Sequence, residues 1–156
     1  MELIIIFLAK YLPYILLAVF FVLFLKKINW SFLFVPLISA LISRFVFTEL
    51  IRFFYFRPRP FVEQGFVPLF EHDPTASFPS GHAAFFFALS AGVYSFNKKA
   101  GLWFFAASFL VGFARFLAGV HYFSDILGGA ALGIFSFWLV EFLIVRFFKK
   151  TVDIEN

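Results

Sequence analysis

The sequence predicts an all-α fold, a polytopic bundle of about five transmembrane helices in a single domain covering residues 1–156. Three observations support this: 63% of the 156 residues are hydrophobic, only 13 are basic and 9 acidic, and the mean hydropathy is +0.96. A soluble domain is about half apolar and about a quarter charged, so this composition excludes one. The absence of cysteine excludes disulfides and thiolate chemistry. Membrane proteins carry lysine and arginine to set their topology, so the net charge of +4 does not imply a nucleic-acid partner, and none is expected.

Five apolar runs approach the length of a membrane-spanning helix, which needs about 20 residues. They lie at about 3–25, 30–51, 81–96, 101–118 and 125–148. The first run is interrupted by Lys10 and Pro13, and the third is short. Charged residues inside spans usually pair with one another, so we expect Arg44 of the second run and Glu141 of the fifth to form a buried ion pair.

Basic residues gather in three of the connections between these runs. Seven of the 13 lysines and arginines lie in Lys26-Lys27-Ile28-Asn29, in Asn97-Lys98-Lys99 and at 146–150. Basic connections face the cytoplasm, which places the N-terminus outside and the C-terminus inside. The connections at about 52–80 and 119–124 then face the periplasm or the cell exterior. We therefore expect a protein integral to the cytoplasmic membrane.

Polar residues elsewhere collect in three clusters at outward helix ends, and a five-span bundle brings these ends to one membrane face. The clusters are Arg52 with Arg57-Pro58-Arg59-Pro60, Ser77-Phe78-Pro79-Ser80-Gly81-His82, and Arg115 with His121 and Asp125. Several arginines together favour a multiply charged anion such as phosphate, because the guanidinium fork matches phosphate oxygens. The alternative is that they extend to lipid headgroups. The remaining histidine, His72, is interpreted as a loop residue.

The second cluster is typical of a helix start, with Ser80 as the N-cap. Free N–H groups in the first turn form an anion site, Gly81 permits close backbone approach, and His82 lies beside the anion. In the third cluster, His121 and Asp125 are four residues apart and share a helix face. A carboxylate bonded to one ring nitrogen leaves the other nitrogen nucleophilic. Each cluster alone also fits a structural role, either a plain helix cap or a structural His–Asp pair.

Taken together, the clusters resemble the type-2 phosphatidic acid phosphatase superfamily of membrane lipid phosphatases. That family's pattern is Lys-x6-Arg-Pro, then Pro-Ser-Gly-His, then Ser-Arg-x5-His-x3-Asp. Here it reads Arg52-x6-Arg59-Pro60, Pro79-Ser80-Gly81-His82 and Ala114-Arg115-x5-His121-x3-Asp125, and the match covers about 44–130. Arg52 replaces the usual lysine and keeps the charge. Ala114 replaces the usual serine and removes a hydroxyl.

The resemblance implies a metal-independent phosphohydrolase without a cofactor. By analogy, His121 attacks the terminal phosphorus and forms a phosphohistidine, while Asp125 orients His121 and raises its basicity. His82 protonates the leaving oxygen and then activates water. Phosphoryl oxygens are held by guanidinium groups and by N–H groups at a helix start: Arg52, Arg59, Arg115, Ser80 and Gly81.

Two further residues are possible members of the site. Glu49 lies one helical turn before Arg52 and is expected to hold it by an ion pair. Arg57 is not required by the family pattern. The residues themselves also argue against a metal, because carboxylates beside the arginines are few and no His, Asp or Glu cluster has dinuclear spacing.

Within the superfamily, the chain looks most like the short bacterial undecaprenyl-diphosphate phosphatases. Three segments carry this resemblance: Arg57-Pro58-Arg59-Pro60-Phe61, Ser77-Phe78 and residues 121–129. The expected partners are a lipid phosphate or diphosphate and membrane lipids. Lipid A 1-phosphatase, phosphatidylglycerophosphate phosphatase and phosphatidate phosphatase are alternatives. A small transporter or lipid-binding membrane protein is an alternative of another class, but it calls for polar residues along the depth of several spans. The sequence contains no signal that sets an oligomeric state.

Overall fold

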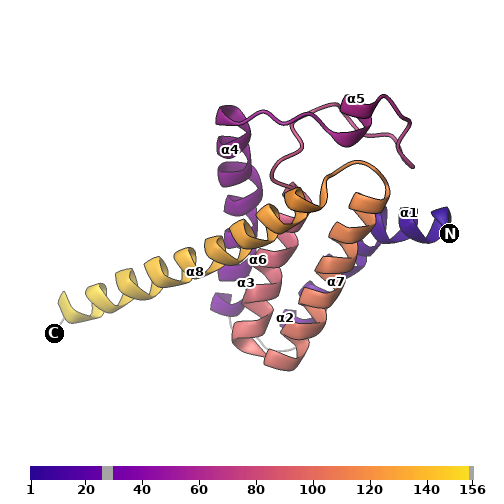
Figure 1. Ribbon diagram of the computed structural model, residues 1–156. Coiled ribbons are helices and arrows are strands. Elements are labelled where there is room, and N and C mark those ends of the chain that lie inside the picture. Colours follow the sequence, from indigo (N-terminus) through magenta and orange to yellow (C-terminus); the bar gives the residue numbers. More distant parts are fainter. Residues whose placement is uncertain (26–29, 155–156) are drawn as a thin grey trace.

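The computed structural model describes residues 1–25 and 30–154, and all of the regular secondary structure in these residues is helical (Figure 1). The helices are α1 (Glu2–Lys10), α2 (Leu12–Leu25), α3 (Trp30–Ile42), the π-helix η1 (Ser43–Phe47), α4 (Thr48–Phe54), α5 (Pro60–Gln64), α6 (Gly81–Phe96), α7 (Lys98–Leu117) and α8 (Phe123–Ile154). The basic connection expected at 26–29 lies outside the described residues. The all-α class predicted from composition is confirmed.

Three stretches are long and apolar enough to cross a membrane: Leu33–Phe54, Lys98–Leu117 and Phe123–Ile144. The pair α1 and α2 adds a fourth if it counts as one bent span. The helix α6 has 16 residues and spans about 24 Å at 1.5 Å per residue, less than the roughly 30 Å of a hydrocarbon core. A membrane-spanning bundle is therefore confirmed, while the count of five and the direction of insertion remain predictions.

The first predicted span is not one straight helix, because α1 and α2 meet at a 41° bend. The cause is Pro13, which has no N–H to donate to the carbonyl of Ala9 four residues earlier. That carbonyl instead accepts a hydrogen bond from Arg115 Nη1 of α7, at 3.3 Å. The bend thereby ties the N-terminal helices to the C-terminal end of α7.

The helix α6 is the centre of the bundle and packs against α3, α7 and α8 (Figure 1). Close approach of α8 depends on Gly129 and Gly133, a small-xxx-small pair of the kind common in membrane helices. A Cβ on Gly133 would lie 2.9 Å from the backbone nitrogen of Ala88, and one on Gly129 would lie 2.9 Å from the Cβ of Ala83. Small residues on α6 and α8 therefore set the spacing of the two helices that carry the second and third sequence clusters.

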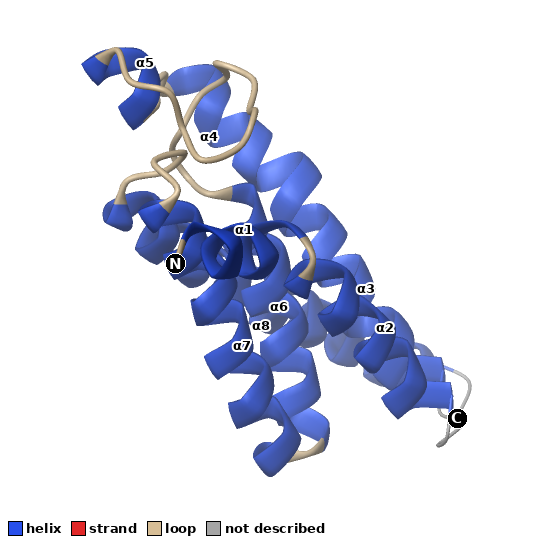
Figure 2. Ribbon diagram, turned by 90° about the vertical axis from the view of Figure 1, so that its right-hand side faces the viewer, coloured by secondary structure: helices blue, strands red, loops and turns tan. Residues whose placement is uncertain are grey.

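The described phenylalanines and tryptophans divide between a packed core and the outer surface. The core includes Leu16, Phe20, Phe86, Leu89, Val93, Phe104 and Val111. Phe53, Phe54, Trp103, Phe135 and Trp138 are among the large apolar side chains that are at least half exposed. Such exposed apolar surface suits lipid contact. In both views the segment that carries α5 lies at one end of the bundle, and the α6–α7 turn lies at the other (Figures 1 and 2).

The π-helix η1 interrupts the second predicted span and changes its side-chain register. Thr48 closes it, because both its backbone N–H and its hydroxyl donate to the carbonyl of Ser43. Residues five apart share a face in a π-helix, so Arg44 meets Glu49 at 2.5 Å. The expected pairing of Arg44 with Glu141 is therefore wrong, because the inserted residue rotates Arg44 toward Glu49.

Candidate active site

Hydrogen bonds join the three sequence clusters at the end of the bundle that carries α5. Arg52 Nη2 donates to the carbonyl of Pro79 at 3.0 Å, which links the first cluster to the second. The N–H of Ser80 donates to the carbonyl of Asp125 at 3.0 Å, which links the second to the third. Arg59 Nη1 lies 3.3 Å from His121 Nε2, which links the third to the first. The predicted convergence of the clusters is confirmed.

The turn after α7 aims His121 back into the bundle. Gly119 has φ +77°, a left-handed conformation that glycine adopts without a steric penalty. The N–H of Val120 then donates to the carbonyl of Arg115 at 3.2 Å, as in a Schellman helix end. His121 follows two residues after the glycine and is only 2% exposed.

The contacts of His121 define which ring nitrogen carries the proton. Arginine only donates, so Nε2, which faces Arg59, must present its lone pair. Nδ1 lies 3.4 Å from Asp125 Oδ2 and carries the hydrogen. Burial, followed by the charges of Arg115 and Arg59, lowers the pKa of His121 to about 3. His121 is therefore neutral at physiological pH, with a lone pair directed at a cationic cavity, which is the state a nucleophile requires.

The carboxylate of Asp125 is fully buried and has several donors besides His121. It accepts hydrogen bonds from Ser77 Oγ, from the N–H of Tyr122 at 2.8 Å and from Arg57 Nη1 at 2.9 Å. Arg57 also stacks on the Tyr122 ring, with its guanidinium carbon 3.9 Å from the ring centre. Arg57, a possible site residue, thus lies behind the histidine and orients Asp125.

Three arginines hold donors toward the cavity in front of His121. Arg59 is 2% exposed and donates to the carbonyl of Val120 at 2.8 Å. Burial, together with the charge of Arg52, lowers the pKa of Arg59 to about 10, so it remains charged at neutral pH. Among buried side-chain atoms of the described residues, the Nε groups of Arg52, Arg59 and Arg115 lack a protein partner. A buried donor without an acceptor is costly, so these side chains have unused capacity for an oxyanion.

These groups surround a cavity of about 330 Å³. Its lining includes Arg44, Arg52, Arg59, Arg115, His82 and His121. His82 is half-buried in the first turn of α6 and borders both this cavity and a larger neighbouring one. Four guanidinium groups and two carboxylates, Glu49 and Asp73, line the space, and this excess of positive charge favours a phosphoryl group over a metal cation. Over residues 1–25 and 30–154, no three His, Asp or Glu side chains gather as a metal site.

The start of α6 differs from expectation in one respect. Ser80 is the N-cap, and its hydroxyl accepts from the N–H of Ala83 at 3.5 Å. Its own N–H donates to the backbone carbonyl of Asp125, so this amide is already paired, and the expected role of Ser80 in phosphate binding stays a prediction. Gly81 and His82 supply the remaining first-turn N–H groups, which have no acceptor within the helix. A Cβ on Gly81 would lie 2.6 Å from Cδ of Arg44, so glycine lets the Arg44 side chain cross the helix start.

Glu49 holds two of the arginines at once. The predicted ion pair with Arg52 is confirmed at 3.1 Å, and Arg44 shares the same carboxylate oxygen at 2.5 Å. Arg44 was expected to form an ion pair within the bilayer core and was therefore not predicted as a site residue. The π-helix that turns it toward Glu49 is not visible in the apolar pattern.

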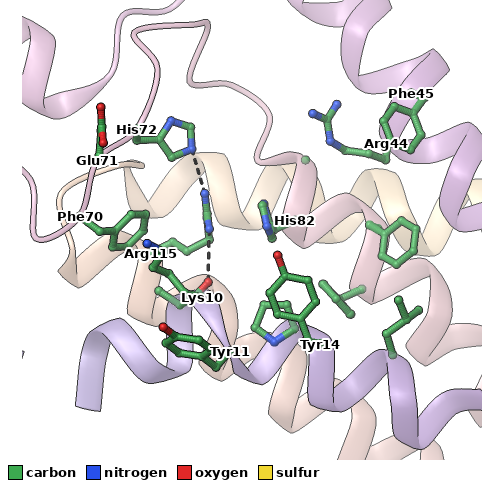
Figure 3. Close-up of a pocket in the computed structure, with 16 residues that line it drawn as sticks. Lys10, Tyr11, Tyr14, Arg44, Phe45, Phe70, Glu71, His72, His82 and Arg115 are labelled. Atoms are coloured by element: carbon green, nitrogen blue, oxygen red, sulfur yellow. Dashed lines mark hydrogen bonds between the residues drawn. The ribbon is translucent and has the colours of Figure 1, made fainter. Parts of the chain in front are cut away.

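His72 is a loop residue, as predicted, but the loop returns it to the site. Its Nε2 accepts from Arg115 Nη2 at 2.9 Å, and its Nδ1 lies 3.1 Å from the carbonyl of Asp73 (Figure 3). Burial, followed by the charge of Arg59, lowers the pKa of His72 to about 4. Its ring meets the His121 ring edge-on, with centres 6.3 Å apart. His72 is thus a neutral residue that positions Arg115.

A sequence model described as the PAP2 superfamily matches residues 30–150. This chain belongs to the PAP2 superfamily. The resemblance to the type-2 phosphatidic acid phosphatases, drawn from three short motifs, is therefore confirmed, and PAP2 membership makes the chain one of a family of membrane phosphatases.

Curated PAP2 relatives are similar over part of their length. Undecaprenyl-diphosphatase BcrC of Bacillus subtilis (strain 168) is 37% identical over 106 residues, covering 68% of this chain and 53% of that protein. Bacitracin transport permease protein BcrC of Bacillus licheniformis is 40% identical over 74 residues, covering 45% and 36%. Phosphatidylglycerophosphatase B of B. subtilis is 36% identical over 95 residues, covering 51% and 44%. The matched part is thus about half or less of each relative.

Two solved PAP2 structures are similar to most of the chain. LpxE of Aquifex aeolicus superposes with a TM-score of 0.71 at 28% identity, covering 89% of this chain and 84% of that one. The first transmembrane PAP2-type phosphatidylglycerolphosphate phosphatase from B. subtilis superposes with a TM-score of 0.59 at 24% identity, covering 93% and 77%. The second likeness shows the fold alone.

Proposed function

We propose that this chain is a metal-independent lipid phosphatase that hydrolyses undecaprenyl diphosphate to undecaprenyl phosphate through a phosphohistidine at His121. The observation that carries the proposal is the neutral His121, whose Nε2 lone pair faces a cavity lined by four arginines. Such a site needs no bound cofactor, because phosphoryl transfer depends mainly on positioning and on stabilisation of charge.

The first step forms a bond from His121 Nε2 to the terminal phosphorus and breaks the bond from that phosphorus to the bridging oxygen of the diphosphate, so that undecaprenyl phosphate departs. Arg52, Arg59 and Arg115 bind the phosphoryl oxygens, and His82 supplies a proton to the departing oxygen. In the second step, water attacks the phosphorus, His82 accepts its proton and the bond to Nε2 breaks. The products are undecaprenyl phosphate and inorganic phosphate.

Asp125 contributes by stabilising charge on the imidazole. Once Nε2 carries the phosphoryl group, the ring becomes cationic and Nδ1 still donates to Asp125. Ser77, Tyr122 and Arg57 hold the carboxylate in place, so little reorganisation accompanies the step.

The similarity to undecaprenyl-diphosphatase BcrC supports the diphosphate substrate, and phosphatidylglycerophosphatase B supports a phosphate monoester as the alternative. A second candidate function is transport, because one relative carries the name of a bacitracin transport permease. Against transport, the arginines and histidines gather around one cavity at one end of the bundle rather than along its depth.

The substrate assay measures phosphate release from four lipids in detergent with excess EDTA: undecaprenyl diphosphate, phosphatidylglycerophosphate, lipid A and phosphatidate. We expect the diphosphate to have the highest kcat/KM. Phosphate labelled at the terminal position should attach to the wild type and not to His121→Asn. Loss of activity in EDTA, or labelling of the variant, contradicts the mechanism.

We also propose that the site faces the periplasm or the cell exterior. Support comes from Lys98 and Lys99, which begin α7 at the end of the bundle opposite α5. A cysteine at Asn97 should resist an impermeant thiol reagent in intact cells, whereas one at Val67, which is 91% exposed, should react. The reverse pattern overturns the orientation without affecting the catalytic proposal.

A further inference from the structure

A second cavity of about 540 Å³ adjoins the one in front of His121 (Figure 3). Five residues border both: Arg44, His72, Gly81, His82 and Arg115. The additional walls come from the α1–α2 bend and from the loop at 70–72. A ligand that extends from the first cavity into the second therefore passes His82, the proposed acid, and Arg115.

We propose that this second cavity binds the non-scissile phosphate of a diphosphate lipid, with Lys10 as its ligand beside Arg115. The inference rests on the proposed function, which places the scissile phosphate against His121. It assigns Lys10 a role in distinguishing a diphosphate from a phosphate monoester.

The structure holds Lys10 and Arg115 together in two ways. Arg115 donates to the carbonyl of Ala9, the neighbour of Lys10, because Pro13 leaves that carbonyl without a helical donor. Lys10 Nζ and Arg115 Cζ each lie 5.6 Å from the centre of the Phe70 ring. Two cations held around one ring repel each other, and an anion bound between them removes that repulsion.

The charges in the cavity match a diphosphate better than a monoester. Lys10, Arg44 and Arg115 are cationic, and Glu71 is the acidic residue among those lining it. When a diphosphate is cleaved, negative charge builds on the departing phosphate, where Lys10 and Arg115 stabilise it. A monoester places an uncharged ester group there and gains nothing from Lys10.

The rest of the cavity is apolar and suits the chain of the lipid. Pro13 and Leu17 of α2 line it together with Phe85 and Phe86 of α6. In Figure 3 the hydroxyl of Tyr14 points toward His82. The cavity thus combines charged side chains shared with the first cavity with apolar side chains of α2 and α6 that suit a lipid chain.

The experiment compares farnesyl diphosphate with farnesyl monophosphate, so that the lipid chain is constant. Lys10→Met in the full chain should lower kcat/KM for the diphosphate at least about tenfold, the expected cost of losing one charge-assisted hydrogen bond. It should leave the value for the monophosphate within about twofold, which also shows that the variant is folded. Lys10→Arg should recover most of the diphosphate activity, and Lys98→Met, at the start of α7, should change neither.

The outcomes separate this inference from the proposed function. A second variant, Lys10→Gln, is measured beside Lys10→Met. If both variants lose activity equally on the two substrates, or lose none on either, the role assigned to Lys10 is refuted, while the proposed function stands. A wild type that cleaves only the monophosphate, or neither compound, overturns the proposed diphosphate substrate and this inference with it. As a second measurement, inorganic pyrophosphate should inhibit monophosphate hydrolysis at least several-fold less in Lys10→Gln than in the wild type, and equal inhibition contradicts the site.

Discussion

Asp125→Asn is the substitution that tests the geometry around His121 most directly. The native carboxylate accepts the proton of Nδ1 and leaves the Nε2 lone pair facing Arg59. An asparagine presents an NH₂ group to several donors at once, so it favours rotation of the side chain and the opposite tautomer of the ring. The nucleophilic lone pair then no longer points into the cavity.

The magnitude follows from the distance between the two groups. Opposite unit charges 3.4 Å apart attract by about 5 kcal/mol at an effective dielectric constant of about 20. That attraction is present only after the ring becomes cationic, so it lowers the barrier to phosphoryl transfer. About 5 kcal/mol corresponds to a decrease of about 10³- to 10⁴-fold in kcat for Asp125→Asn.

Rapid-quench measurement of phosphoenzyme formation is the appropriate assay, because it isolates the step that involves His121. Asp153→Asn is the matched control, since Asp153 lies in the same helix, α8, near its other end. The thermal midpoint of each variant in detergent shows whether it is folded. A folded Asp125→Asn that forms phosphoenzyme within about tenfold of the wild-type rate would refute the role assigned to Asp125.

Three further predictions concern protonation, packing and phosphate binding. Burial lowers the pKa of His72 to about 4 and that of His121 to about 3, against an ordinary value of about 6.5. Between these values the unfolded chain binds more protons than the folded chain, so the apparent Tm in detergent should fall as the pH drops from about 6.5 to 4. A Tm that stays constant over this range contradicts the prediction. Gly133→Leu should lower both Tm and kcat/KM, because the new side chain meets the backbone of α6. The control Ala131→Leu, on the exposed face of α8, should lower neither. Equal effects of the two variants in thermal scans and activity assays would contradict the role of Gly133 in packing. Arg44→Met should raise KM about tenfold or more if its guanidinium binds a phosphoryl oxygen, and steady-state kinetics with an unchanged KM would exclude it from the site.

The helices and most of the site were predictable because local spacing carries them. Long apolar runs identify α7 and α8, and Ser80 before an apolar run identifies the start of α6. The four-residue spacing of His121 and Asp125 places them on one face before any fold is known. In each case the interacting groups are close along the chain, so backbone geometry alone brings them together.

Local spacing misled the prediction where the helix register changed. The π-helix at Ser43–Phe47 adds one residue to a turn, and it turns Arg44 toward Glu49 instead of toward Glu141. Ser80 likewise has its N–H turned toward Asp125 rather than toward the cavity. Neither change is visible in the apolar pattern, because that pattern shows which residues are apolar and not which hydrogen-bonding groups meet.

By itself, the sequence determined that this is a membrane helix bundle of the PAP2 type. It also indicated His82, His121, Asp125, Arg52, Arg59 and Arg115 as candidate site residues, but not Arg44 or His72. Only the tertiary structure decided that His72 supports Arg115 across 43 residues, and that the carbonyl of Ala9 meets Arg115 across 106 residues. Contacts over such separations depend on close packing of small residues between helices and on the bend at Pro13. The long connection and the N-terminal helices therefore acquire their place at the site only when the bundle is assembled.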